Sequence, residues 1–289
     1  MGSDVLLTIA LALFFGAGLF VLANHVAVPA IVPLLIGGIL LGPEGIGLIN
    51  TVVLGDMLRI IISICVAIVL FEGGLTLHPE GFRKASGVIT KLLTVGVLAT
   101  WLLTALAVYL IFGHSLELSL LAGSLIIVTG PTVITPLLKR LNVKEELDHI
   151  LHWEGVMNDP IGVFIAVLCF EWISVDAAAI NHLGTFGLRL GVGIVFGSIC
   201  GKAVLWMLDR DWIPEEQTNI FVLATAIALF SISDIVAHES GILSVVIAGL
   251  VLGWQQEQTP RLKNLVQFKS ELTEIAIGLL FVLLAANSP

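Results

Sequence analysis

Charged residues are scarce in this sequence. They make up 12% of it, against 57% hydrophobic residues, whereas soluble domains average about 25% charged residues. Together with a mean hydropathy of +1.07, this composition excludes an ordinary soluble protein. Because every backbone group in lipid must be paired within the protein, the apolar segments are expected to be helices. The sequence therefore predicts an all-α polytopic membrane protein, and the lack of a basic patch indicates no nucleic-acid partner.

Cysteine is also rare. The three cysteines, Cys65, Cys169 and Cys200, are spread through separate apolar runs. An odd number at such spacing argues against a disulfide framework and against a metal cluster, so we expect small core residues. The N-terminal residues MGSD carry none of the positive charge of a signal peptide, and the first apolar run is therefore expected to be a retained span.

Apolar windows separated by polar or Gly/Pro breaks predict about ten transmembrane spans. The second and ninth windows are short for a full crossing, and Pro29 and Pro33 favour a broken or steeply packed second helix. No linker or soluble domain interrupts the series, so residues 1–289 are interpreted as one membrane domain. The windows lie near residues 5–23, 28–42, 57–77, 88–112, 117–138, 150–173, 184–208, 218–237, 240–254 and 271–286.

The basic residues give the orientation of the spans. All except Arg59 and Arg189 lie after the odd-numbered spans three, five, seven and nine, and by the positive-inside rule that side is cytoplasmic. We therefore expect a multi-pass protein of the cell inner membrane with its N-terminus outside. The cytoplasmic set is Arg83, Lys84, Lys91, Lys139, Arg140, Lys144, Lys202, Arg210, Arg261, Lys263 and Lys269.

The most informative stretch is EGVMNDP at residues 154–160, inside the sixth window. A charge at the bilayer centre costs about 3 kcal/mol on insertion scales, and such residues usually face a cavity that serves ions or protons. Glu154 and Asn158 share one helix face, whereas Asp159 lies about 140° away from Glu154. Pro160 removes a backbone donor, so we expect a kink that turns carbonyls toward a cation. The alternative is a short polar break within a packed bundle.

The fifth window contains a second break, TGPT at residues 129–132. Glycine followed by proline disrupts helical hydrogen bonding, and unwound backbone at this depth requires cover from protein or a cavity. The freed carbonyls and the Thr129 hydroxyl are hard oxygen ligands of the kind that small cations prefer, and discontinuous helices form the ion sites of transporters. The alternative is a proline kink whose hydroxyls bond back to the helix.

Other polar residues have structural or interfacial interpretations besides functional ones. Glu72 lies near the predicted cytoplasmic end of span three and either lines an entrance or is structural. Asp234 and His238 share a face at the outer boundary, as an interfacial polar cluster would. Glu171 lies at the outer end of span six, where solvation explains it. His152 either modulates the site with pH or is an interfacial histidine.

The ordered set of motifs resembles the cation/proton antiporter-1 family, in particular bacterial sodium/proton exchangers of the NhaP type. The resemblance rests on Asn158-Asp159 with Glu154 before it, and on the Thr-x-Pro break. It also rests on three stretches, which are PAIVPLLIGGILLGP at residues 29–43, LFEGGL at residues 70–75 and SGILSVVIAGLVLG at residues 240–253. It covers the whole chain in order.

The resemblance implies two inverted repeats with crossed, broken helices in the core. By resemblance, Asp159 binds the transported ion, Thr129 offers oxygens at the break, and Asn158 holds the site together. Glu154 would pair with an arginine beyond residue 289 and support the cavity. The resemblance also implies a homodimer, no cofactor, and as ligands only the transported Na⁺ and H⁺.

This sequence departs from the family pattern in two places. Family members commonly carry Asp where this chain has Gly130, and some place a serine hydroxyl where this chain has Gly155. The family also has about three more spans than this chain, so the transporter domain is expected to be incomplete at its C-terminus.

We therefore interpret the chain as a secondary antiporter, not an enzyme. It would exchange Na⁺ or Li⁺, or else K⁺, for H⁺ and so serve pH homeostasis, with Asp159 alternately binding cation and proton. One carboxylate that swaps one monovalent ion for another moves no net charge, which favours electroneutral exchange. The alternative is a non-transporting or channel-like protein that retains the antiporter fold. An intramembrane hydrolase is disfavoured, because no second aspartate accompanies Asp159 and no Ser/His pair lies at matching depth.

Overall fold

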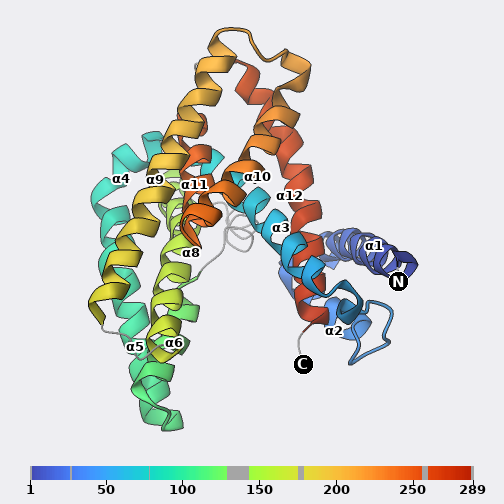
Figure 1. Ribbon diagram of the computed structural model, residues 1–289, viewed down its shortest axis with the longest axis vertical. Helices are drawn as coiled ribbons and strands as arrows, with labels where there is room; N and C mark the ends of the chain where they lie inside the picture. Colours follow the sequence, from blue (N-terminus) through green and yellow to red (C-terminus); the bar gives the residue numbers. More distant parts are fainter. Residues whose placement is uncertain are drawn as a thin grey trace.

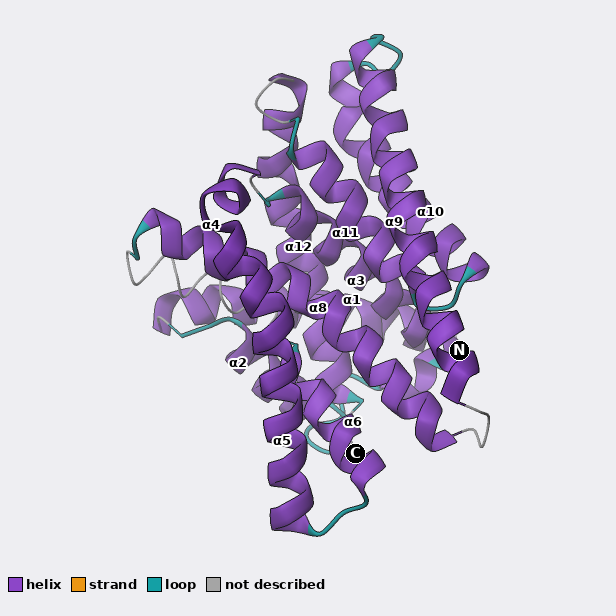
Figure 2. Cartoon of the chain, turned by 90° about the vertical axis from the view of Figure 1, so that its left-hand side faces the viewer, coloured by secondary structure: helices purple, strands orange, loops and turns teal. Residues whose placement is uncertain are grey.

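The protein is all-helical throughout the residues described by this computed structural model, which are 2–26, 28–77, 79–128, 143–174, 179–255 and 260–287 (Figure 2). This confirms the predicted class. The α-helices are α1 (Gly2–Val26), α2 (Ile31–Leu41), α3 (Asp56–Leu75), α4 (Pro79–Lys91), α5 (Val97–Phe112), α6 (Leu116–Ile127), α8 (Glu145–Ser174), α9 (Ala179–Asp209), α10 (Thr218–Val236), α11 (Ser240–Gly253) and α12 (Pro260–Ala286). Two 3₁₀ turns, η1 (Thr51–Leu54) and η3 (Glu215–Gln217), and one π-helical turn, η2 (Leu92–Gly96), complete the list.

The helices confirm the predicted spans. Six helical segments are long and apolar enough to cross a membrane, counted over the described ranges, and α4, η2 and α5 form one of them (Pro79–Phe112). The second and ninth windows, predicted to be short, are α2 and α11, and α6 is a third short apolar helix. Pro33 lies in the first turn of α2, where its missing N–H breaks no helical hydrogen bond.

A first bundle is built around α11, which packs against α3, α9 and α10, while α12 joins α3 to α1 and α2 (Figure 1). Glycines allow the backbones of these helices to approach closely. A Cβ atom added at Gly249 of α11 would lie 2.3 Å from the carbonyl oxygen of Phe71 in α3. One added at Gly197 of α9 would lie 2.4 Å from the carbonyl oxygen of Ser244 in α11. These contacts fix α3, α9 and α11 relative to one another.

A second bundle contains α4, α5, α6 and α8, which lie together on the opposite side of the molecule from α1, α2 and α12 (Figure 1). A Cβ atom at Gly123 of α6 would lie 2.6 Å from the carbonyl oxygen of Trp101 in α5. The indole of Trp101 donates a hydrogen bond of 2.8 Å to the Leu120 carbonyl. The second bundle is thus also interlocked within itself.

The two bundles meet through side chains. A shared apolar cluster between them includes Phe71 and Leu229 from the first bundle and Trp153 and Val156 from the second. Leaving aside Gly2, Gly73 and Gly155, every described glycine whose added Cβ would come within 3.0 Å of another helix joins helices of the same bundle. At these glycines, the close backbone approaches lie inside each bundle.

The close approach of α11 and α3 predicts a large effect for a small substitution. In Gly249→Ala the methyl group would meet the carbonyl of Phe71, and overpacking of this kind costs about 1–3 kcal/mol. We expect a lower thermal unfolding temperature in detergent. The control is Gly191→Ala on α9, where an added Cβ meets nothing within 4 Å and a helical Gly→Ala change is neutral or stabilising. Equal unfolding temperatures for the two variants would contradict this account of the packing.

Candidate functional site

The residues of the EGVMNDP stretch lie on α8, a single helix from Glu145 to Ser174. Its first turn contains Glu145, Glu146 and Asp148, whose negative charges favour the helix N-terminus. The helix continues through Pro160 without interruption, and the kink expected there stays a prediction. Pro160 still has no N–H, and the carbonyl of Val156 therefore receives no i+4 hydrogen bond.

Glu154 and Asn158 are joined by a hydrogen bond along one face of α8, as their spacing predicted. The Asn158 Nδ2 donates to Glu154 Oε1 at 2.5 Å, and Asn158 is only 5% exposed. Because the amide nitrogen is directed toward Glu154, the carbonyl oxygen is the atom of this side chain that would contact a cation. The pair thus fixes the rotamer of the residue that precedes Asp159.

Asp159 is partly buried, and its Oδ1 atom is fully buried without a hydrogen-bond donor from the described residues. A buried carboxylate oxygen without a donor is costly, and a bound cation or proton compensates for that cost. The negative charge of Glu154 acts on Asp159 electrostatically. A cation at Asp159 relieves this repulsion, so the local charge favours a positively charged ligand.

The other candidate ligand, Thr129, and the break at residues 129–132 lie outside the described residues. Its described neighbour Val128 has an extended backbone (φ −66°, ψ 113°), because α6 ends at Ile127. Val128 lies against α8, where a Cβ added at Gly162 would meet its Cγ2 atom at 2.6 Å. Gly162 follows Asp159 by less than one helical turn, so the chain enters the 129–132 stretch beside the part of α8 that carries Asp159.

His152 links α8 to the end of α3. Thr76 Oγ1 donates to the Gly73 carbonyl at 2.8 Å and lies 2.9 Å from His152 Nε2. Since the hydroxyl proton is directed to Gly73, the Nε2 of His152 acts as the donor to Thr76. Sequence reasoning left His152 open between a pH modulator and an interfacial residue, and the structure places it in a contact between the two bundles. Glu72, on the same last turn of α3, is partly buried.

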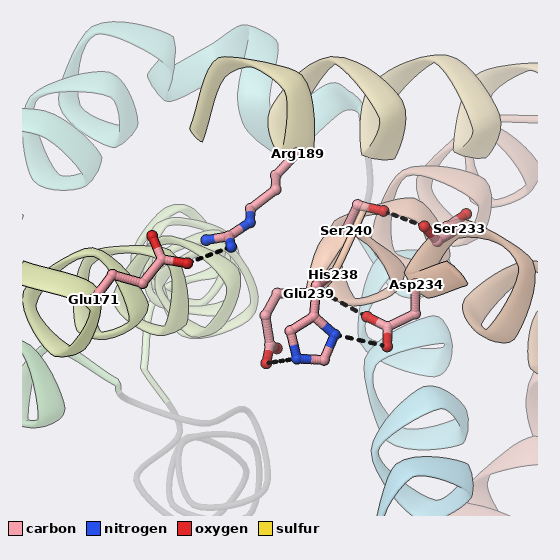
Figure 3. A network of polar contacts seen from close by, with 7 residues as sticks. All are labelled: Glu171, Arg189, Ser233, Asp234, His238, Glu239 and Ser240. Atoms are coloured by element: carbon pink, nitrogen blue, oxygen red, sulfur yellow. Dashed lines mark hydrogen bonds and ion pairs between the residues drawn. The ribbon is translucent and has the colours of Figure 1, made fainter. Parts of the chain in front are cut away.

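Glu171 forms an ion pair that the sequence analysis missed. Its Oε1 accepts a hydrogen bond of 2.5 Å from Arg189 Nη2 of α9 (Figure 3). Arg189 is only 8% exposed, so the explanation of Glu171 by solvation was wrong. The signal that could have found the pair is Arg189 itself, because an arginine inside an apolar segment usually has a partner in the protein.

The polar cluster predicted around Asp234 and His238 forms the turn between α10 and α11 (Figure 3). Asp234 Oδ1 accepts a hydrogen bond of 2.6 Å from the Glu239 backbone N–H, and Asp234 Oδ2 lies 3.5 Å from His238 Nδ1. The His238 side chain is 68% exposed. The residues therefore shape an exposed polar turn, as the interfacial interpretation predicted. The part of the chain that the structure describes has no group of three or more His, Cys, Asp and Glu residues arranged to hold a metal ion.

Comparison with known proteins supplies independent information. A family model described as sodium/hydrogen exchanger, transmembrane, matches residues 9–289. The chain is 26% identical over 292 residues to the "Probable Na(+)/H(+) antiporter 2" of Methanocaldococcus jannaschii. The aligned region covers 96% of this chain and 68% of that protein. It is 30% identical over 238 residues to the "K(+)/H(+) antiporter NhaP2" of Shewanella sp. (strain MR-4), covering 80% of this chain but only 40% of that protein.

A solved structure has the same fold. The sodium proton antiporter MjNhaP1 from Methanocaldococcus jannaschii at pH 8 superposes with a TM-score of 0.85 at 22% sequence identity. The match covers 98% of this chain and 71% of the solved chain. The helical arrangement described above is therefore an antiporter fold, in agreement with the predicted fold class.

Proposed function

Because this chain belongs to the sodium/hydrogen exchanger family, we propose that it takes part in the exchange of a monovalent cation for H⁺ across a membrane. The observation that supports this most is the burial of Asp159 Oδ1 without a hydrogen-bond donor from the described residues. Asp159 lies on α8, a helix long and apolar enough to cross a membrane. Asn158 and Glu154 form the supporting pair beside it. Na⁺, Li⁺ and K⁺ all suit oxygen ligands of this kind.

Asp159 is the group that carries the ion in this proposal. Its carboxylate holds either the cation or the proton, so binding of one displaces the other. Exchange then needs no cofactor and no chemical energy source, because the site changes sides only when it is loaded. One proton replaces one monovalent cation, so no net charge moves and exchange is electroneutral.

The other residues support this carboxylate. Asn158 adds its carbonyl oxygen as a cation ligand, and Glu154 orients Asn158 through the hydrogen bond of 2.5 Å. We assign Thr129 as a further oxygen ligand, since Val128 next to it lies against Gly162 on α8. In the cell, such an exchanger of the inner membrane would serve pH homeostasis, and we propose that it acts as a homodimer.

Everted membrane vesicles test the proposed function. With a pH-sensitive dye, addition of Na⁺, Li⁺ or K⁺ to vesicles that contain the full-length protein should move protons in the direction opposite to the cation. The responses to the three cations give the selectivity. A cation conductance without proton movement would instead indicate the channel-like alternative, which Gly130 in place of the family's usual Asp favours.

The orientation makes a separate prediction, which rests on the Lys/Arg asymmetry. The loop at residues 210–217 should face the cytoplasm and the loop at residues 113–115 the outside. In a cysteine-free background, a cysteine at the exposed position of His114 should react with a membrane-impermeant reagent added to intact cells. A cysteine at exposed Glu216 should react only in everted vesicles. The reverse labelling pattern would invert the topology.

A further inference from the structure

The helix that carries Asp159, α8, belongs to the second bundle and makes few contacts with the first bundle. α8 packs mainly against α4 and α6 and only lightly against α3 and α9. In secondary transporters, alternating access is largely the rocking or gating of one bundle against another. If this protein exchanges ions as proposed, the contacts between α8 and the first bundle are the ones that must break and form again.

One of these contacts is the Glu171–Arg189 ion pair. It lies about 18 Å along α8 from Asp159, on the side that we propose to be external. Between the two, Phe164 of α8 and Phe186 of α9 meet edge to face with ring centroids 6.0 Å apart. The Arg189 Nη1 is buried and has no hydrogen-bond partner among the described residues, while Nη2 is bonded to Glu171. In the described part of the chain, Glu171 supplies the opposite charge to which the arginine is hydrogen-bonded.

This ion pair contributes little to holding the fold of either bundle. Close glycine contacts already fix α9 on α11, at Gly193, Gly197 and Gly201. α8 packs closely against Val128, the residue that follows α6, through Gly162. Buried ion pairs are weak evidence of net stability, because desolvation offsets much of the attraction, but removing one partner alone is costly. The pair is thus a contact between α8 and the first bundle that can break without disturbing the close glycine contacts of α9 with α11.

We propose that Glu171 and Arg189 form a latch that closes α8 against α9 and opens during each exchange cycle. The latch gates the path to Asp159 on one side of the membrane. It positions α8 without touching the transported ion, so its effect is on the movement of the site between the two sides. This inference rests on the proposed exchange function.

Cross-linking tests the latch. Glu171→Cys and Arg189→Cys are combined in a full-length protein whose Cys65, Cys169 and Cys200 are replaced by alanine, and a short bis-methanethiosulfonate joins the two thiols. Exchange in proteoliposomes should fall at least tenfold on cross-linking and return on reduction. The matched control is Lys84→Cys with Glu145→Cys, because that exposed ion pair of 3.9 Å joins α4 and α8 within one bundle. Its cross-link should leave exchange unchanged. Equal exchange by the cross-linked and reduced latch variants would overturn the proposal.

A distance measurement gives a readout that does not depend on transport. Spin labels are placed at Phe170 of α8 and Ile199 of α9, which are 59% and 63% exposed. An opening latch predicts two distance populations, and Glu171→Gln combined with Arg189→Gln should shift them toward the longer distance. If the parental protein and the double Gln variant both showed the same single distance, with and without Na⁺, the ion pair would have only a structural role. Two populations in a protein without exchange would support the latch and contradict the proposed function instead.

Discussion

Asp159→Asn should abolish exchange of Na⁺, Li⁺ or K⁺ for H⁺, while the protein still folds and inserts into the membrane. The amide keeps the shape of the carboxyl group but can neither release a proton nor balance the charge of a bound cation. Because Oδ1 of Asp159 lacks a hydrogen-bond donor among the described residues, no described donor is stranded by the change. Dye-monitored exchange in proteoliposomes should fall to the rate of protein-free liposomes, and the unfolding temperature in detergent should stay close to that of the parent.

Two further variants separate the charge from its position. Asp159→Glu keeps the titrating group but moves it along the side chain, so we expect partial exchange with altered cation affinity. Asn158→Asp adds a carboxylate beside Glu154, yet it should not by itself make exchange electrogenic, because coupling requires a second group that titrates in the cycle. Parental exchange by a folded Asp159→Asn protein would show that Asp159 is not the carrier, and Glu154 and Glu72 would be the next candidates.

Acidification should strongly weaken the apparent affinity for the cation. If proton and cation compete for one carboxylate, each lowers the affinity for the other by the same factor. Once that carboxyl group is mostly protonated, the cation concentration for half-maximal exchange should rise about tenfold for each further pH unit. The maximal rate at saturating cation should change much less, because enough cation displaces the proton.

The measurement is a series of cation titrations of initial exchange rate in proteoliposomes, with equal pH on both sides at the start. Asp159→Glu serves as a control that should show the same competition with a shifted midpoint. A half-maximal concentration that is independent of pH, combined with a falling maximal rate, would contradict competition at a single carboxylate. It would indicate that the proton acts at a second site, for which Glu154 and His152 on α8 are candidates.

The fold was largely predictable from the sequence. Long apolar windows leave the backbone no alternative to helices in lipid, so helices appear where the spans were predicted, and even the short α2 and α11 were anticipated. Within the site, the hydrogen bond from Asn158 to Glu154 follows from residues four apart on one helix face. Such features depend on the hydrophobic and helical periodicity of neighbouring residues, which can be read from a single sequence.

The features that were missed depend on tertiary contacts. The kink expected at Pro160 stays a prediction, since α8 continues through that residue as one helix. Glu171 was explained by solvent because its partner Arg189 lies on another helix. Thr76 gave no signal at all, since only the fold brings α3 to His152. The assignment of Thr129 remains a prediction, because the break lies outside the described residues.

Proton release on cation binding tests the central claim most directly, since it requires no transport. Isothermal titration calorimetry of purified protein with Na⁺, Li⁺ or K⁺, in buffers of different ionisation enthalpy, gives the number of protons released per cation bound. At a pH where Asp159 is mostly protonated, the account predicts release of about one proton per cation by the parental protein, because the two ligands share one carboxylate. Asp159→Asn should neither bind the cation nor release a proton. Cation binding with the same proton release by the folded Asp159→Asn protein would contradict the account.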